Sequence, residues 1–258
     1  MAGIGETAAA GRTSFGSWIT IANPLSAEAM ARAGFDWLIL DAQHGGVTPD
    51  NLPGLLQAVE LGGTQAIVRV AWNDPAQIMR ALDLGAGGVI VPMVSSAEDA
   101  RRAVEAVRYP PLGQRSFGKL RTPYAPSAST AQEPLCLVMI ETAAALARLD
   151  EIAATPGIDG LFVGPADLSL SMGFAFTTDL APEVMTAIAT VVTAAGRHGI
   201  LSGSASFGSD NAMALVAMGM GFITLGSDMG MIRRGAAAEV GHARQWTAQA
   251  VSVAPVDG

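Results

Sequence analysis

Cysteine is nearly absent from the sequence, with one residue among 258, and this scarcity excludes two kinds of architecture. A single cysteine cannot close a disulfide bond within the chain, and it cannot build a cysteine-based zinc site. Cys136 lies inside the apolar run LCLVMIE, a setting that predicts an inert thiol in the protein core.

Charge is also scarce, at 15% of the residues, and its balance is acidic. The 15 lysines and arginines face 23 aspartates and glutamates, so the formal net charge is -8. No basic stripe is present that could meet a phosphate backbone, which argues against a nucleic-acid partner. A basic helix for a membrane surface is missing as well.

Long hydrophobic runs are the third absence. No run approaches the roughly 20 apolar residues that a membrane span needs. The first stretch, MAGIGETAAAGRTSFG, has neither the positive start nor the apolar centre of a signal peptide. We therefore expect a soluble, cytoplasmic protein without a membrane partner.

Short hydrophobic runs, in contrast, are frequent, and half of all residues are hydrophobic. Eight runs rich in Val, Ile and Leu recur along the chain, and their nearly continuous apolarity predicts strands that are buried on both faces. They cover residues 16–21, 36–41, 65–70, 87–94, 135–141, 160–164, 199–204 and 221–228.

Alanine-rich segments with helical spacing separate these runs. Ser26, Asp74 and Ser96 are typical helix starts, and glycines close the helices before the next run. Strand–helix alternation repeated eight times predicts an α/β fold of the (β/α)8 TIM-barrel type, for which about 250 residues is the usual size. An open dinucleotide-binding sheet is less favoured because no GxGxxG follows the first strand. We expect one barrel domain over residues 1–258, with its core at about 14–235, a flexible N-terminus and a loose C-terminal tail.

One segment breaks the alternation. Residues 109–134, YPPLGQRSFGKLRTPYAPSASTAQEP, form a long loop after the fourth strand that is rich in Pro, Ser and Gly. So long an irregular insertion is either functional or mobile. Its cations Arg115 and Arg121 either meet a carboxylate of a substrate or face solvent, and Lys119 lies between them.

Polar groups gather where the predicted strands end, which is where barrel enzymes place their chemistry. A histidine, an arginine and several acids converge on this edge from separate parts of the sequence. The residues are Asp41, Gln43, His44, Arg69, Glu141, Asp167 and Asp228.

Three of these groups have both a structural and a chemical interpretation. Glu141 is either a buried acid that pairs with an arginine or a ligand, and Asp167 either caps the helix after Pro165 or is a ligand. Together their oxygens suit Mg²⁺ or Mn²⁺. Arg69 either pairs with an acid or stabilises a carboxylate or an enolate.

Three further residues carry weaker signals. Asp83 comes late in a predicted helix, and its spacing alone indicates a solvated surface acid. His198 precedes a helix-closing glycine and His242 lies in the last helix, so structural or solvent-facing roles are favoured for both.

Five collinear motifs resemble those of a known family. They are GFDWLILDAQHG, VRVAWNDPAQIMRALDLGAGGVIVPMV, VRYPPLGQRSFG, MIET and GIDGLFVGPADLSLSMG, spread over residues 14 to 235. They are similar to motifs of the metal-dependent (class II) pyruvate aldolases of the hydroxyketoacid aldolase family, which includes the 4-hydroxy-2-oxoheptanedioate and 2-dehydro-3-deoxyglucarate aldolase types. Citrate lyase beta subunits are more distant members of the same superfamily.

The resemblance implies a role for each matching residue. Glu141 and Asp167 would be the metal ligands, and Arg69 would contact the keto oxygen of pyruvate. His44 would be the base, with Asp83 as its dyad partner, which replaces the surface interpretation of Asp83. The substrate-binding backbone would be that of Gly164, Pro165, Ala166 and Asp167.

The resemblance also implies partners and a cofactor. The cation would be Mg²⁺ or Mn²⁺, with Co²⁺ a further candidate, and the substrates would be a 2-oxo acid such as pyruvate and an aldehyde. The family commonly forms trimer-based homo-hexamers in which the last helix is exchanged between neighbours. Gln43 and Met139 stand where some relatives have Glu and Gln, so the preferred metal and the exact pyruvate contacts stay open.

The expected activity is reversible cleavage of 4-hydroxy-2-oxo acids to pyruvate and an aldehyde through an enolate, as used in catabolism of aromatic compounds or sugar acids. A Schiff-base mechanism is disfavoured because none of the eight runs contains a lysine. The alternatives are a CoA-ester lyase or an oxaloacetate decarboxylase with the same enolate, and a non-catalytic protein that binds 2-oxo acids.

Overall fold

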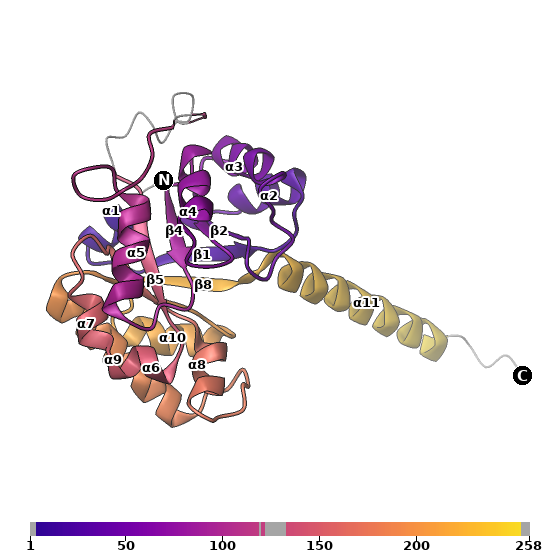
Figure 1. Ribbon diagram of the computed structural model, residues 1–258. Helices are drawn as coiled ribbons and strands as arrows, with labels where there is room; N and C mark the ends of the chain where they lie inside the picture. The colour runs from indigo at the N-terminus through magenta and orange to yellow at the C-terminus, as the bar shows by residue number, and fades with distance from the viewer. Residues whose placement is uncertain (1–3, 119, 122–132, 254–258) are drawn as a thin grey trace, which may run out of the picture.

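The computed structural model describes residues 4–118, 120–121 and 133–253, and eight parallel strands close into a barrel (Figure 1). Each strand pairs with the next, and β8 pairs with β1, so the predicted (β/α)8 barrel is confirmed. The strands are β1 (Ser14–Ile19), β2 (Trp37–Asp41), β3 (Gln65–Arg69), β4 (Gly88–Val91), β5 (Leu135–Ile140), β6 (Gly160–Val163), β7 (Leu201–Ala205) and β8 (Phe222–Ser227).

Helices between the strands cover the outside of the barrel, whereas α1 precedes β1 and α11 follows β8. Those of the first half are α1 (Ile4–Ala9), α2 (Pro24–Ala31), α3 (Leu52–Leu61), α4 (Pro75–Asp83) and α5 (Ala97–Val107). Those of the second half are α6 (Ala143–Ala147), α7 (Leu149–Ala153), α8 (Pro165–Ser171), α9 (Pro182–His198), α10 (Ser209–Ala217) and α11 (Asp228–Val253).

The helix starts follow the capping chemistry of the sequence, with one difference. Asp74 accepts the Ala76 N–H at 2.9 Å and Ser96 accepts the Asp99 N–H at 3.1 Å, so both predicted N-caps are confirmed. The prediction for Ser26 is wrong. The N-cap of helix α2 is Asn23, three residues earlier, because Pro24 fits the first helical position.

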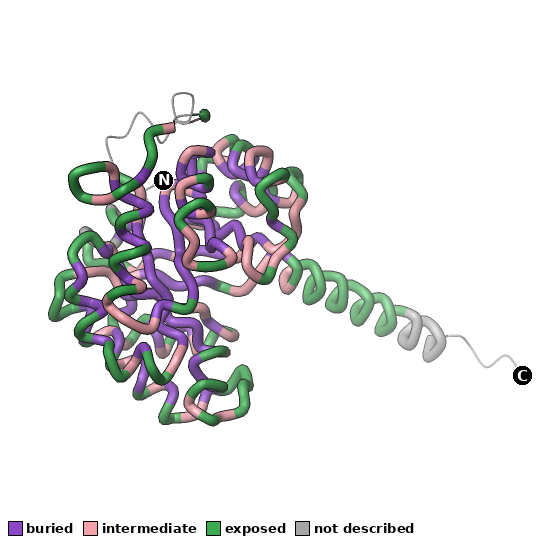
Figure 2. Tube along the Cα trace, in the orientation of Figure 1, coloured by how far each residue is buried: buried purple, intermediate pink, exposed green. Residues whose placement is uncertain are grey.

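The barrel has two hydrophobic layers. The larger one packs the strands against the surrounding helices, and the smaller one fills the barrel interior with large rings. The strands are largely buried, whereas the described part of α11 is mostly exposed (Figure 2). The Trp37 and Phe222 rings meet edge to face with their centres 5.7 Å apart. Gly203 makes room for this packing, because a Cβ atom there would lie 2.2 Å from the Phe222 ring.

The two ends of the chain carry helices that the sequence analysis did not expect. Residues 4–9 form helix α1, which buries Ile4 completely in the interior cluster, and the flexibility of the N-terminus stays a prediction. Helix α11 continues to Val253, so the expected loose tail is helical over 250–253, and residues 254–258 lie outside the described part. In both cases helical segments replace what composition alone indicated as loose chain.

The two edges of the barrel differ in what they present. We call the edge formed by the carboxyl ends of the strands the mouth, and the edge formed by their amino ends the amino edge. The long insertion follows α5 rather than β4 directly, so its described residues, up to 118 and 120–121, lie at the amino edge. Lys119 and residues 122–132 lie outside the described residues.

Helix α11 leaves the barrel at the end of β8 and projects away from it (Figure 1). Its described side chains are mostly exposed, among them the apolar Met229, Ile232, Val240 and Trp246. Over the residues described, no helix combines the length and apolarity needed to cross a membrane.

Candidate active site

The mouth brings together an arginine and three acids that are far apart in the sequence. Asp41 and Arg69 are the last residues of β2 and β3, Glu141 follows β5, and Asp167 lies in the first turn of α8 after β6. The charges of Asp167 and Arg69 both act on the Glu141 carboxyl. The predicted convergence of Arg69, Glu141 and Asp167 at one edge is therefore present in the structure.

Arg69 is held rigidly by Asp41. Its Nε donates to Asp41 Oδ1 at 2.9 Å and its Nη2 donates to Asp41 Oδ2 at 2.7 Å, in a buried two-pronged ion pair. The guanidinium also stacks on Trp18, with Cζ 4.3 Å from the ring centre. No hydrogen bond of the described residues uses Nη1, so this edge of Arg69 can serve a ligand.

Asp41 was named in the sequence as a polar strand end without a role, and the structure supplies one. Asp41 and Arg69 are register partners in the β2–β3 pair, so their side chains leave the barrel at the same height. The alignment of two strand ends depends on register, which the spacing in the sequence does not reveal. Arg69 thus pairs with an acid, as one of the two interpretations predicted. This pairing does not prevent Arg69 from also stabilising a carboxylate or an enolate.

Asp41 also shapes the turn that carries His44. Its Oδ1 accepts the N–H groups of Gln43 at 3.1 Å and His44 at 3.2 Å. Gly45 follows closely, since a Cβ atom there would lie 2.5 Å from the Asp41 carbonyl oxygen. His44 is exposed at the mouth, and within the described part of the chain no hydrogen bond or ion pair involves its imidazole.

Glu141 is a carboxyl group held in an unfavourable place. It is only 1% exposed, and its Oε1 accepts the Met93 N–H at 2.6 Å. Met93 adopts a left-handed backbone conformation with φ of 57°, which is strained for a residue other than glycine. The strained backbone conformation of Met93 directs its N–H toward Glu141 and so fixes the position of this carboxylate.

Electrostatics around Glu141 indicate what the site would accept. Burial raises the pKa of the Glu141 carboxyl, the Met93 N–H lowers it, Asp167 raises it further and Arg69 lowers it. Two neighbouring carboxylates repel each other, and a divalent cation between hard oxygen donors would relieve that repulsion. The donor chemistry of Glu141 and Asp167 therefore fits a metal ion.

The loop between β6 and α8 lets Asp167 approach Glu141. Gly164 is needed there, because a Cβ atom would lie 2.7 Å from Glu141 Oε2. Pro165 and Ala166 then start the helix, and Asp167 is exposed in its first turn. Within the described residues no group of three or more His, Cys, Asp or Glu side chains could hold a metal, so water and substrate would complete the shell around two carboxylates.

Asp83 does not reach His44 within the chain. As the last residue of α4, which runs back from the mouth, Asp83 lies at the amino edge. Its Oδ1 accepts Arg115 Nη2 at 2.7 Å, and its carbonyl oxygen accepts the Arg121 N–H at 3.3 Å. The predicted His44–Asp83 dyad is therefore not formed within one chain, because a helix that follows a strand ends at the opposite edge, and a catalytic role of Asp83 stays a prediction.

The loop cations are paired at the amino edge too. Arg115 is buried against Asp83, and Arg121 bonds Glu60 at the end of α3. The sequence left two alternatives for these arginines, a substrate carboxylate or solvent. In the structure both arginines instead pair with acids of the chain. Asp228, by contrast, closes the barrel: its carboxylate accepts the N–H groups of Thr20 and Ile21, both at 2.9 Å.

The two remaining histidines stay outside the mouth. His198 ends α9 beside Asp150, with 3.3 Å between Nε2 and Oδ1, and His242 is exposed on α11. Structural or solvent-facing surroundings are thus present for both.

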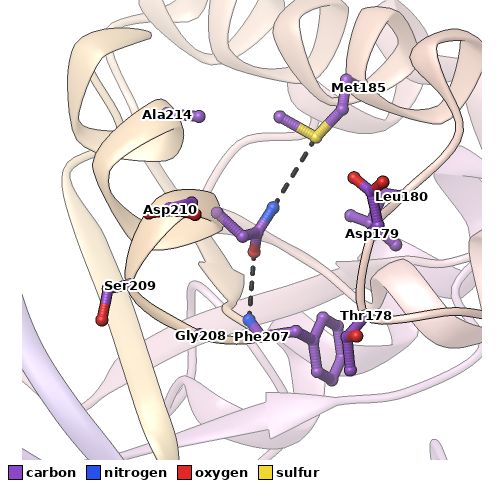
Figure 3. Close-up of a pocket in the computed structure, with 10 residues that line it drawn as sticks. Thr178, Asp179, Leu180, Met185, Phe207, Gly208, Ser209, Asp210 and Ala214 are labelled. Atoms are coloured by element: carbon purple, nitrogen blue, oxygen red, sulfur yellow. Dashed lines mark hydrogen bonds between the residues drawn. The ribbon is translucent and has the colours of Figure 1, made fainter.

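A separate pocket of about 490 Å³ lies between α9 and the start of α10 (Figure 3). Asn211 is one of the residues that line it; its Oδ1 accepts the Phe207 N–H at 3.1 Å and its Nδ2 donates to Met185 Sδ at 3.7 Å. None of the site residues named above lines this pocket, so we do not place the chemistry there.

Comparisons with known proteins agree with this geometry. Residues 14–235 match the family described as HpcH/HpaI aldolase/citrate lyase. The 4-hydroxy-2-oxo-heptane-1,7-dioate aldolase of Salmonella paratyphi C is 40% identical over 243 residues, which cover 90% of this chain and 91% of that protein.

Solved structures show the same fold. An HpcH/HpaI aldolase/citrate lyase family protein from Burkholderia cenocepacia superposes with a TM-score of 0.83 at 30% identity, covering 91% of this chain and 95% of that one. The CitE protein of Mycobacterium tuberculosis, solved with magnesium and acetoacetate, shares the fold with a TM-score of 0.56 at 19% identity, over 83% and 85% of the two chains. The chain, with its barrel and its acidic mouth, belongs to the HpcH/HpaI aldolase/citrate lyase family.

Proposed function

We propose that this protein is a divalent-metal-dependent aldolase that reversibly cleaves 4-hydroxy-2-oxo acids to pyruvate and an aldehyde. The observation that carries the proposal is the buried Glu141 carboxyl, held beside Asp167 and Arg69 at the mouth of the barrel. The 40% identity to a 4-hydroxy-2-oxo-heptane-1,7-dioate aldolase supports this choice of reaction.

Glu141 and Asp167 are the residues that would hold the cation. Mg²⁺ and Mn²⁺ suit two carboxylates with water and substrate oxygens, and Co²⁺ is a further candidate. When bound, such an ion supplies Lewis-acid polarisation of the 2-oxo group. The magnesium in the distantly similar CitE protein agrees with a hard cation in this fold.

Arg69 would stabilise the negative charge of the enolate oxygen. Its bonds to Asp41 and its stacking on Trp18 leave Nη1 available and fix its direction before substrate arrives. A donor that needs no reorganisation favours the charge that develops during the reaction. For the pyruvate carboxylate we propose the backbone of Gly164, Pro165, Ala166 and Asp167.

His44 would take the proton from the C4 hydroxyl group. Loss of that proton lets the C3–C4 bond break, and its electron pair moves into the C2–C3 bond to form the enolate, which is then protonated at C3 to give pyruvate. Because Asp41 binds the N–H of His44, we assign the positioning of this turn to Asp41 in place of Asp83.

The exposed apolar side chains of α11 suggest that the helix packs against other copies of the chain. We propose a homo-oligomer, with the trimer-based hexamer as the expected form. Ile232, Val240 and Trp246 would be covered there, since a projecting helix gains little stability alone. The molar mass in solution, by light scattering, tests this assembly, and a monomer contradicts it.

The deciding experiment measures pyruvate release from 4-hydroxy-2-oxo acids. The protein is first treated with EDTA and then supplied with Mg²⁺, Mn²⁺ or Co²⁺. We expect no release in EDTA and recovery with metal. Glu141→Gln should not recover, whereas Glu183→Gln, an exposed acid of α9, should behave like the unaltered protein.

Other outcomes would point to other functions. Undiminished cleavage in EDTA would contradict the metal-dependent mechanism. Binding of CoA in a thermal-shift titration would favour a CoA-ester lyase, and turnover of oxaloacetate alone would favour a decarboxylase. Binding of 2-oxo acids without any turnover would leave a binding protein.

A further inference from the structure

The planar guanidinium of Arg69 needs two kinds of contact to fix its direction. The two bonds to Asp41 hold one edge of the group, but they leave it free to tilt about that edge. The Trp18 ring covers the flat face of the guanidinium, with Arg69 Cζ 4.3 Å from the ring centre, and this contact removes the remaining freedom. The tilt of the Arg69 plane therefore follows the tilt of one indole ring.

The backbone of β1 delivers Trp18 to this position through an irregular pairing with β8. Gly16 is the register partner of Thr224, but the register shifts before Trp18, which pairs with Ser227. Irregularities of this kind re-aim side chains and are frequent next to active sites. The Trp18 ring then packs edge to face on Phe162, with the ring centres 5.9 Å apart.

Thr224 supplies the polar contact that orients the Trp18 ring. Its Oγ1 accepts Trp18 Nε1 at 2.8 Å. An indole ring can be turned over within nearly the same space, which would carry its N–H to the other side, so the hydroxyl group selects one of two orientations. Apolar packing on Phe162 alone does not make this selection.

The Thr224 hydroxyl is an unusual choice for its surroundings. Thr224 is 0% exposed and lies on the same strand as the interior ring of Phe222. Valine has nearly the same shape and carries no polar group that must be desolvated. Across the residues that the structure describes, the bond to Trp18 is the only hydrogen bond of this hydroxyl, so its effect on the barrel is exerted through Trp18.

The direction of Arg69 matters most while the bond breaks. No hydrogen bond of the described residues uses Arg69 Nη1, which is the donor we assign to the enolate oxygen. A hydrogen bond weakens steeply when donor and acceptor are out of line. Because the charge on the enolate oxygen develops only during the reaction, a misdirected donor costs more in the transition state than in the bound substrate.

We propose that Trp18 and Thr224 are positioning residues for Arg69. The Thr224 hydroxyl orients the indole ring, and the ring sets the plane in which Arg69 Nη1 meets the enolate oxygen. Both residues act through Arg69 and not on the reacting atoms. This assignment rests on the proposed aldolase function and adds the device that aligns its enolate-stabilising cation.

Thr224→Val removes the hydroxyl group with little change of shape, and Thr224→Ser keeps it. Pyruvate release is measured with Mg²⁺ present, together with the inhibition constant of oxalate, a planar dianion that resembles the pyruvate enolate. For Thr224→Val we expect kcat to fall about tenfold with KM nearly unchanged, and the inhibition constant of oxalate to rise by a similar factor. Thr224→Ser should behave like the unaltered protein.

Trp18→Leu tests whether the effect passes through Arg69. Loss of the ring face should weaken oxalate binding about tenfold to a hundredfold, as for a desolvated cation–π contact. In an Arg69→Lys background the same substitution should change oxalate affinity less than threefold, because the planar group that the ring aligns is already gone. Calorimetric titration with oxalate measures all four proteins without requiring turnover.

Trp37→Phe is the matched control for Trp18→Phe. Trp37 is also an indole of the barrel interior, but it begins β2 at the amino edge, and within the described residues its Nε1 has no hydrogen-bond partner. Trp18→Phe retains a ring but loses the bond to Thr224, so it should lower kcat as Thr224→Val does. Trp37→Phe should leave kcat per folded molecule and oxalate affinity unchanged.

The outcomes separate this proposal from the aldolase function. Unchanged kcat and oxalate inhibition in Thr224→Val, or a rise of KM alone, would overturn the positioning role while leaving the aldolase activity in place. An equal loss of oxalate affinity from Trp18→Leu with Arg69 and with Lys at that position would show that Trp18 does not act through Arg69. If the unaltered protein cleaves no 4-hydroxy-2-oxo acid, the aldolase proposal itself fails, and this one with it.

Discussion

The mouth and the amino edge of the barrel use the same kinds of charged residue in opposite ways. At the amino edge, Arg108 bonds Asp159 at 2.7 Å and the carbonyl oxygens of Pro134 and Gly157, and Arg115 pairs with Asp83. At the mouth, the buried Glu141 has a second acid beside it and a strained residue, Met93, as its donor.

This difference separates the part of the barrel that stabilises the fold from the part to which we assign the chemistry. Removing one partner of a buried charge pair destabilises the folded chain, whereas like charges held together raise the free energy of the folded chain until a ligand relieves their repulsion. Strained backbone of the Met93 kind persists only where the surrounding structure enforces it. Whether a charged side chain has an oppositely charged partner thus indicates the candidate site better than the type of residue does.

Asp41 is an exception to this contrast, because it lies at the mouth and is nevertheless fully paired. We expect its removal to have the largest effect. Asp41→Ala would leave the Arg69 guanidinium buried without a partner, which costs about 3–5 kcal/mol of unfolding free energy. We expect pyruvate release to fall as well, because Arg69 and the His44 turn lose their support. Denaturant unfolding and the pyruvate assay check this, with Asp50→Ala, an exposed acid beyond the same turn, as the control. Unchanged stability would contradict the role of the pair.

Asp167→Asn should separate activity from stability. The proposed cation loses one of two carboxylates, so we expect turnover to fall about a hundredfold to a thousandfold. Without metal, the variant should unfold at the same temperature as the unaltered protein or higher, because the repulsion on Glu141 is relieved. Thermal unfolding in EDTA measures this, with Asp179→Asn as an exposed control. A less stable metal-free variant would show that Asp167 serves the fold.

Arg108→Met should show the reverse pattern at the amino edge. The Asp159 carboxylate and two carbonyl oxygens lose their donor, which we expect to cost about 1–3 kcal/mol of stability. Turnover per folded molecule should stay unchanged. Arg102→Met, an exposed arginine of α5, the helix that Arg108 directly follows, is the control for the loss of charge. A drop in kcat would mean that the amino edge contributes to the reaction.

The smallest effect concerns Cys136, next to this ion pair. Burial, and then the nearby Asp159 charge, raise the pKa of its thiol from 9.0 to about 12. Between these values the thiol ionises only in the unfolded chain, so its contribution to stability is complete below pH 9 and is lost as the pH rises toward 12.

Above pH 9, the unfolding free energy of the unaltered protein should therefore fall relative to that of Cys136→Ala. The expected loss is up to about 1.4 kcal/mol per pH unit. Denaturant unfolding at pH 8 and pH 10 measures it. A thiol reagent should label Cys136 only after unfolding. Rapid labelling of the folded protein would show that the thiol is accessible.

The fold and part of the site could be predicted from local pattern. Eight buried runs with helices between them specify a parallel barrel, and a parallel barrel sends every strand end to one edge, which placed Glu141 and Asp167 together. Asp83 teaches the converse. Its late position in a helix indicated a solvated surface acid, whereas the structure pairs it with the buried Arg115, and the dyad implied by the family resemblance is not formed within the chain.

What the sequence by itself determined is the order and the type of the elements, because hydrophobic periodicity and capping act between residues that are close along the chain. Only the tertiary structure decided which charges pair. Asp41 faces Arg69 through strand register, Arg115 meets Asp83 across an insertion, and Trp18 of the first strand stacks on Arg69 of the third. Such contacts join residues that are brought together only when the barrel closes, and no local periodicity encodes them.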